Sequence, residues 1–126
     1  MNLTVEQTHL RAVDGNDAPG ELIRLAAEAE RAAASDIHLQ QRSGGVEVAF
    51  RLDGVLTPVL NYSADLGRLV LGRIKFLARL KTYDDQLPQD GRIDRDALRI
   101  GSDVRVSTYP TVTGEKVVRS EERRVG

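Results

Sequence analysis

Two arginines occupy positions from which they could bind an anion. Arg92 ends the run Leu87-Pro-Gln-Asp-Gly-Arg92, in which Asp90-Gly91 predicts a tight turn with a positive φ angle. Arg105 lies in Asp103-Val-Arg-Val-Ser107, whose alternating pattern predicts a strand with both valines on the opposite face. Guanidinium groups held on short rigid elements suit a phosphate better than they suit a core. The alternative is that both are solvated arginines or partners in surface salt bridges, because surface arginines are common.

The surrounding pattern predicts an α+β domain with two main helices, a three-stranded antiparallel sheet and a smaller C-terminal β segment. Residues 1–18 are weakly patterned and are predicted as an arm with one short strand over 10–13. The other predicted elements are a helix over residues 19–34, strands over 37–40, 46–53 and 55–60, a helix over 65–81, and strands over 99–107 and 116–119.

Local signals mark the borders of these elements. Asp53-Gly54 is the strongest two-residue hairpin signal and joins the second and third predicted strands. Pro58 has no N–H group, so the third strand should lie at an edge or break there. Ser63 is a predicted N-cap of the second helix, and Thr113-Gly114 is predicted as a hairpin turn.

The second predicted helix is basic outside its apolar stripe, which consists of Leu66, Leu69, Val70, Ile74, Leu77 and Leu80. No acidic residue occurs between Leu66 and Thr82. The basic residues are Arg68, Arg73, Lys75, Arg79 and Lys81. One interpretation is a docking face for an acidic partner or a phosphate. The other is a solvated helix face whose cations lie favourably near the C-terminus.

Composition limits the classes of function. The chain has 126 residues, with 18 basic and 19 acidic side chains and a formal net charge of −1, so a broad electrostatic grip on nucleic acid is not indicated. It has no cysteine, and no apolar run approaches the ~18 residues of a membrane span. The first residues lack the pattern of a signal peptide. These properties predict a soluble cytoplasmic domain.

No complete active site can be assembled from the sequence. Thr113-Gly-Glu-Lys116 lacks the first glycine, the spacing and the hydroxyl of a phosphate-binding loop. His9 and His38 are the two histidines, and no cysteine could join them in a zinc site. We therefore predict no catalytic residue and no metal site, and we interpret His38 as a polar surface or hydrogen-bonded structural residue.

An ordered set of motifs resembles a known family. The motifs are Ala34-Ser-Asp-Ile-His38, Arg51-Leu-Asp-Gly-Val-Leu56, Arg73-Ile-Lys75, Leu87-Pro-Gln-Asp-Gly-Arg92, Asp103-Val-Arg-Val-Ser-Thr108 with Pro110, and Gly114-Glu-Lys-Val-Val118. Together they resemble the N-terminal subdomain of the ATPases that drive type II secretion and type IV pilus assembly. The resemblance implies a PAS-like subdomain over residues 19–118, preceded by the arm over 1–18. It also implies that residues 119–126, which depart from the family pattern, are a tail that is either non-native or left by truncation.

The resemblance also implies a role for the two arginines. In the family, the arginines at the positions of Arg92 and Arg105 reach the nucleotide that a following RecA-like motor domain holds. ATP and Mg are therefore implied for the full-length protein, with none expected for the isolated chain. The implied partners are the motor domain, neighbouring subunits of a homo-hexamer, and inner-membrane secretion or pilus machinery. No nucleic acid is expected, and the implied location is the cytoplasmic side of the inner membrane.

Two other classes of function compete with this interpretation. One is a stand-alone PAS-like sensor or protein-interaction module, although two Phe, three Tyr and no Trp give little aromatic lining for a ligand pocket. A phosphate-loop motif in the coding DNA beyond residue 126 would favour the ATPase. The other class is nucleic-acid binding through the basic helix over residues 65–81, which strongly salt-dependent DNA binding would support.

The isolated chain should bind ATP with a dissociation constant of millimolar or weaker, and should not hydrolyse it. Two charge-assisted arginine–phosphate contacts contribute roughly 3–6 kcal/mol together. Association costs about 4 kcal/mol or more in lost freedom, which leaves little net affinity. Isothermal titration calorimetry measures this directly, and a micromolar dissociation constant would contradict it.

Overall fold

A computed structural model describes residues 10–82, 87–111 and 114–121, with side chains described as far as residue 109. The elements, in chain order, are β1 (Arg11–Val13), α2 (Ala18–Arg31), β2 (Asp36–Arg42), β3 (Gly45–Leu52), β4 (Val55–Ser63), α3 (Ala64–Leu77), β5 (Gln89–Ile93), α4 (Arg95–Leu98), β6 (Val104–Thr111) and β7 (Gly114–Glu121). The predicted α+β class is confirmed.

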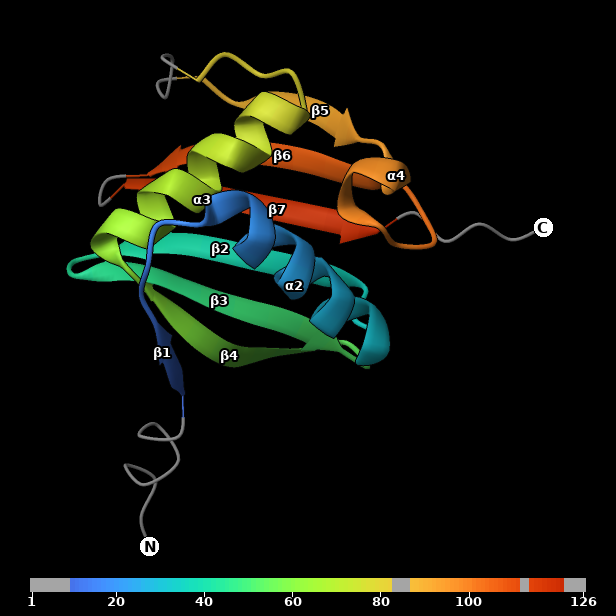
Figure 1. Cartoon of the computed structure of the whole chain (residues 1–126), viewed down its shortest axis with the longest axis horizontal. Coiled ribbons are helices and arrows are strands. Elements are labelled where there is room, and N and C mark those ends of the chain that lie inside the picture. The colour runs from blue at the N-terminus through green and yellow to red at the C-terminus, as the bar shows by residue number, and fades with distance from the viewer. Residues whose placement is uncertain (1–9, 83–86, 112–113, 122–126) are drawn as a thin grey trace, which may run out of the picture.

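All seven strands belong to one sheet, in the order β1-β4-β3-β2-β7-β6-β5. Neighbouring strands are antiparallel except β1 and β4, which are parallel. Helices α2 and α3 lie over the same face of this sheet, as Figure 1 shows. The opposite face, which we call the open face, carries none of the described helices.

Strand β7 corrects the prediction of a separate C-terminal β segment. It pairs with β6 on one side and with β2 on the other, so that the three predicted strands become part of a seven-stranded sheet. The predicted arrangement would have left the β2 edge unpaired, which sheets avoid. The strand prediction over 116–119 is confirmed within a longer strand that begins at Gly114, and the turn predicted at Thr113 lies outside the described residues.

The first helix begins at a side-chain cap. The carboxylate of Asp17 accepts a hydrogen bond from the N–H of Gly20 at 3.1 Å, and Pro19 lies in the first turn, where its missing N–H has no consequence. The helix ends at Arg31, earlier than predicted. Just beyond it Ala33 takes a left-handed conformation with φ 58°, which turns the chain into β2.

Helix α3 is capped by Ser63, as predicted. Its hydroxyl oxygen accepts from the N–H of Leu66 at 3.2 Å and donates to the carboxylate of Asp14 at 2.6 Å. The bond from Ser63, followed by that from the N–H of Gly15, holds the pKa of Asp14 below its usual value. One hydroxyl thus joins the β1–α2 loop to the start of α3.

The β3–β4 hairpin follows its predicted signals. Asp53 and Gly54 both have positive φ, at 51° and 83°, as a two-residue hairpin loop of this type requires. Pro58 lies opposite Ala49, beside a register shift in the pairing with β3. The other neighbour, β1, reaches only residues 60–62 of β4, so Pro58 lies on an edge, where its missing N–H is tolerated.

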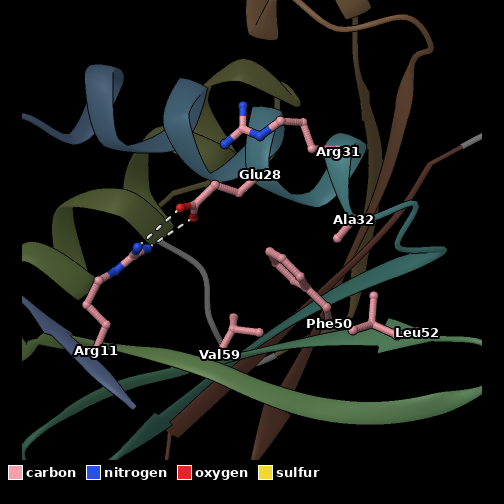
Figure 2. A pocket seen from close by; sticks show the side chains of 7 residues that line it. All are labelled: Arg11, Glu28, Arg31, Ala32, Phe50, Leu52 and Val59. Carbon is pink, nitrogen blue, oxygen red and sulfur yellow. Dashed lines mark hydrogen bonds and ion pairs between the residues drawn. The ribbon is translucent and has the colours of Figure 1, made fainter. Parts of the chain in front are cut away.

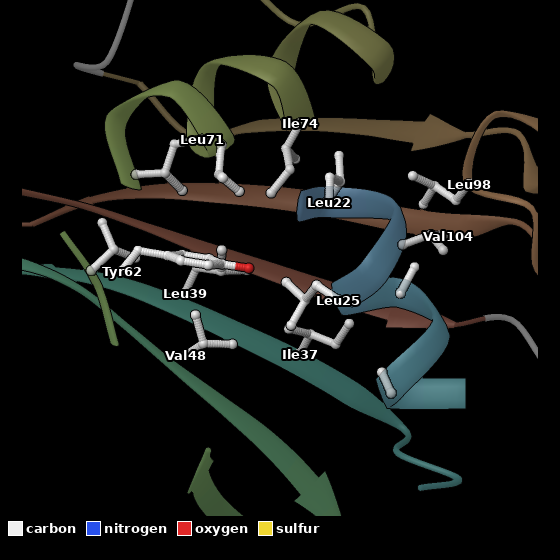
Figure 3. Packing of buried hydrophobic residues seen from close by; sticks show 14 of the residues in the cluster. Leu22, Leu25, Ile37, Leu39, Val48, Tyr62, Leu71, Ile74, Leu98 and Val104 are labelled. Atoms are coloured by element: carbon white, nitrogen blue, oxygen red, sulfur yellow. The ribbon is translucent and has the colours of Figure 1, made fainter. Parts of the chain in front are cut away.

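The core lies between the two helices and the sheet, and Figure 3 shows its packing. The helices and strands β2, β3, β4, β5 and β6 contribute apolar side chains that are almost completely buried. Among them are Leu22, Leu25, Ile37, Leu39, Val48, Tyr62, Leu71, Ile74 and Val104. The alternation of these residues along the strands leaves polar residues on the open face.

The predicted turn at Asp90-Gly91 is wrong, because both residues lie inside β5. Gly91 pairs with Val106, and it is not among the residues with positive φ. A side chain at this position would place its Cβ 2.5 Å from the carbonyl oxygen of Ala78 and 2.8 Å from Leu80. The glycine is needed because β5 passes directly against the end of α3.

The strand predicted over 99–107 also begins later than expected. A short helix, α4, precedes it and ends at Arg99, which has a left-handed conformation with φ 60°. Strand β6 then begins at Val104. Leu98 of α4 is buried against the core, which anchors the connection between β5 and β6.

Substituting Gly91→Ala should destabilise the chain by roughly 1–3 kcal/mol, because the added methyl group meets fixed backbone. Gly72→Ala is the matched control. Its Cβ would meet no atom within 4 Å, and removing a glycine from a helix should stabilise by about 1 kcal/mol. Urea unfolding measures both changes, and equal stabilities for the two variants would contradict the close approach of β5 to α3.

Candidate functional site

Arg92 and Arg105, the two arginines that the sequence singles out, lie directly opposite each other in the β5–β6 pair. Their neighbours Ile93 and Val104 are buried beneath the helices, so the two arginines face the open side of the sheet. Both arginines are exposed. Directly opposed residues in an antiparallel pair have their Cβ atoms ~4.5–5.5 Å apart. The fold therefore brings the two guanidinium groups within reach of a single anion.

Two acidic residues, one on β5 and one directly before β6, balance this charge. A carboxylate oxygen of Asp103 lies 3.6 Å from Nη1 of Arg92, and its other oxygen accepts the backbone N–H of Arg95 at 2.9 Å. The carboxylate of Asp90 accepts the hydroxyl of Ser107 at 2.7 Å. Asp103 is thus held by the start of α4 while it contacts Arg92, which fixes where that guanidinium lies. The nearby carboxylates also weaken the attraction of the isolated chain for phosphate.

A third arginine on the open face was not identified from the sequence as a site residue. Arg51 of β3 lies opposite Asp36 of β2, and its Nε donates to the Asp36 carboxylate at 3.2 Å. Its Nη1 also donates to the carbonyl of Gly54 at 3.2 Å. The register continues from Asp36 across β7 to Arg105, so both arginines lie in one row. The sequence feature that could have identified Arg51 is its position in β3, where polar residues of the open face alternate with buried apolar residues.

His38 also lies on the open face, half-buried in β2 opposite Ala49. It lines a small cavity of about 100 Å³ together with polar and apolar neighbours. These are Gln40, Arg42, Glu47, Ala49, Leu56 and Pro58. The placement agrees with the structural role predicted for His38.

A larger cavity of about 450 Å³ lies on the helix-covered side of the sheet, between α2 and strands β3 and β4 (Figure 2). Phe50, Leu52 and Val59 make its apolar wall. At its mouth Arg11 donates to both carboxylate oxygens of Glu28, at 3.0 and 3.2 Å, and this hydrogen bonding raises the pKa of Arg11. The cavity is therefore separated from Arg92 and Arg105 by the sheet.

No group of three or more His, Asp or Glu side chains in the described parts of the chain could hold a metal ion. Within the same residues, no helix is long and apolar enough to cross a membrane. The described site therefore offers guanidinium groups and their carboxylate partners.

Comparisons with known proteins agree on one family. Residues 17–123 match the family model described as "Type II/IV secretion system protein". Over 110 residues the chain is 46% identical to type II secretion system protein E of Pseudomonas aeruginosa. The aligned region covers 82% of this chain and 21% of that protein. Over 94 residues it is 46% identical to type II secretion system ATPase E of Vibrio cholerae. This aligned region covers 72% of this chain and 18% of that protein.

Among solved structures, the chain resembles the pilus retraction motor PilT with bound ADP. The TM-score is 0.54 and the identity 18%, over 82% of this chain and 29% of that chain, so this likeness concerns the fold alone. The chain spans about a fifth of the length of the two curated relatives that it matches.

The opposed arginines should reduce the stability of the isolated chain. Replacing Arg105→Gln removes the like-charge contact with Arg92 while the Arg92–Asp103 pair remains, so stability should rise by roughly 0.2–1 kcal/mol. Urea unfolding at low salt measures the gain, which should shrink at high salt. Arg105→Lys is the control, because it keeps the charge, and an equal gain in that variant would contradict the repulsion.

Proposed function

Because the chain belongs to the type II/IV secretion system protein family, we propose that it is the coupling subdomain that precedes the motor domain of a secretion or pilus ATPase. Its resemblance to this family, inferred from the motifs, is confirmed by the comparisons. In the assembled protein, Arg92 and Arg105 contact the terminal phosphates of ATP. The observation that carries this proposal is their direct opposition on the open face of the sheet.

The arginines act by position and charge. Each guanidinium can donate two parallel hydrogen bonds to phosphate oxygens, and together they neutralise charge that develops on the phosphates during transfer. Asp103 serves as a positioning residue, because it contacts Arg92 while its other oxygen is held by the backbone of Arg95. When the phosphate arrives, it competes with Asp103 for Arg92 and leaves Arg105 to make the second contact.

The nucleotide and its metal belong to the motor domain in this proposal. The arginines fit the phosphate end of ATP, whereas the described residues contain no cluster suited to Mg²⁺. ATP supplies the phosphoryl group that is transferred, and this chain supplies the two cations that lie against it.

The sheet provides the mechanical link. Arg92 and Arg105 lie on β5 and β6, which are joined through β7 to β2 and so to the rest of the molecule. A change at the phosphates that moves these strands must therefore move the whole subdomain. This movement, a rotation of the subdomain relative to the motor domain, would act on neighbouring subunits of a homo-hexamer. From the cytoplasmic side, it would also act on inner-membrane secretion or pilus machinery.

ATP hydrolysis by the full-length protein tests this function. Arg92→Ala and Arg105→Ala should each lower kcat by about 10²-fold or more, as loss of one charge-stabilising donor does in other enzymes. Arg51→Ala is the matched control, because this arginine lies on the same face but is engaged by Asp36. Thermal unfolding and gel filtration should show that all three variants remain folded and assembled.

The proposal is wrong if Arg92→Ala and Arg105→Ala hydrolyse ATP at the rate of the unmodified protein. The two arginines would then be surface residues, and the subdomain would serve for assembly alone. Loss of activity in Arg51→Ala to the same degree would show instead that any disturbance of the open face stops turnover.

A second candidate function is that of a stand-alone PAS-like sensor. The observation that favours it is the cavity of about 450 Å³ beside α2, which falls in the size range of small-molecule sites, ~300–1,000 Å³. Coding sequence beyond residue 126 without a phosphate-loop motif would favour this alternative.

A further inference from the structure

We propose that the outer face of α3 is a docking surface for an acidic amphipathic helix of a partner protein. This surface consists of an apolar seam, formed by Leu69, Gly72 and Phe76, and of three arginines beside it, which are Arg68 and Arg73 on the helix and Arg79 just beyond its C-terminus. It lies on the helix-covered side of the sheet, so it can be occupied while an anion is bound at Arg92 and Arg105.

The seam is unusually exposed for apolar residues of a well-packed helix. Phe76 has 65% of its surface exposed and Leu69 has 40%, although the other side of α3 is buried through Leu66, Val70 and Ile74. The sequence pattern assigned Leu69 to the buried stripe, and the structure corrects this. Folding of the described chain therefore does not explain why these two residues are apolar.

The spacing of the seam favours a helix as the occupant. Leu69, Gly72 and Phe76 stand at i, i+3 and i+7, which is the spacing that one helix presents to another in side-by-side packing. Gly72 has no side chain to cover the backbone between the two larger residues, and a Cβ placed there would meet open space. A side chain of the partner can therefore approach the α3 backbone closely at this position.

The charges along the seam favour an acidic occupant. From Leu66 to Thr82 the sequence contains five basic residues and no acidic one. Lys75 is buried and takes no part in the surface, which corrects its predicted place on the basic face. Asp65, at the start of α3, lies 3.6 Å from Arg68. The predominant charge that a partner meets along the seam is therefore positive.

Arg73 is arranged to receive a carboxylate. Its guanidinium carbon lies 5.5 Å from the centre of the Phe76 ring, so the cation rests against the apolar seam. Its Nε is shielded from solvent and has no hydrogen-bond partner among the described residues. The two Nη groups of the same guanidinium can donate to a carboxylate of a docked helix.

The test uses this chain with a designed helical peptide as the probe. The peptide carries Leu at its a and d positions and Glu at e and g, and a matched peptide carries Lys in place of Glu. Titration followed by backbone amide NMR should show binding of the Glu peptide, with the largest shifts at Leu69, Gly72 and Phe76. The Lys peptide should bind at least tenfold more weakly.

Matched variants locate the binding. Phe76→Asp should weaken binding of the Glu peptide at least tenfold, whereas Val55→Asp, at an apolar residue with 64% exposure on another element, should leave it unchanged. Arg73→Gln should weaken binding and reduce its dependence on salt. Circular dichroism checks that each variant is folded.

Several results would overturn the proposal. The first is that the Glu peptide does not bind at millimolar concentration. The others are that the Glu and Lys peptides bind equally well, or that Phe76→Asp and Val55→Asp weaken binding of the Glu peptide equally. Sedimentation of the chain alone as a dimer that Phe76→Asp converts to a monomer would assign the seam to a second copy of this chain. Tight binding of duplex DNA that is lost in Arg73→Gln would assign it to nucleic acid.

Discussion

The pairing of β2 with β7 is the contact on which the rest of the structure depends. It joins a group of four strands, β1 to β4, to a group of three, β5 to β7, within one sheet. Within the sheet, this pairing is what connects the two arginine-bearing strands to β2 and to the strands beyond it. Because the pairing involves main-chain groups, it tolerates changes of side chain but requires that β7 be present.

Local structure was predictable because its causes lie within a few residues. The alternation in β3, the loop at Asp53-Gly54 and the cap at Ser63 each depend on neighbouring positions, and each is confirmed. The arrangement of the sheet was not predictable in the same way. The register that sets Leu39 opposite Val117 joins residues far apart in the chain, and no local pattern encodes it.

In the candidate site, too, local features were predictable from the sequence, whereas contacts between distant residues were not. The sequence identified Arg92 and Arg105 as residues on rigid elements, but for Arg92 the assumed element was wrong. The Asp90-Gly91 pattern predicts a turn. The structure instead requires a glycine at position 91 because β5 passes close to Ala78, and this tertiary contact has no local sequence pattern. That the two arginines lie opposite each other follows from the β5–β6 register. The contact of Asp103 with Arg92 likewise became visible only in the structure.

The two charged surfaces of the molecule differ in how their cations are balanced. On the open face, Arg51 and Arg92 each have a carboxylate of the same sheet nearby, so any anion must displace an internal partner. Such competition favours release of the anion as well as its binding, as the proposed contact with ATP requires. On α3, Arg73 instead rests on an aromatic ring and keeps a shielded donor with no hydrogen-bond partner among the described residues. This arrangement suits a lasting contact.

The position of β7 has a consequence for the order in which the protein can acquire its shape during synthesis. Of the described strands it leaves the ribosome last, yet it occupies an interior place in the sheet between β2 and β6. Until it emerges, the β2 edge presents unpaired backbone groups, and β5 and β6 have no sheet to join. At that stage the β2 edge of the nascent chain is open to pairing with other chains, and the β6–β7 hairpin closes the sheet once β7 has emerged.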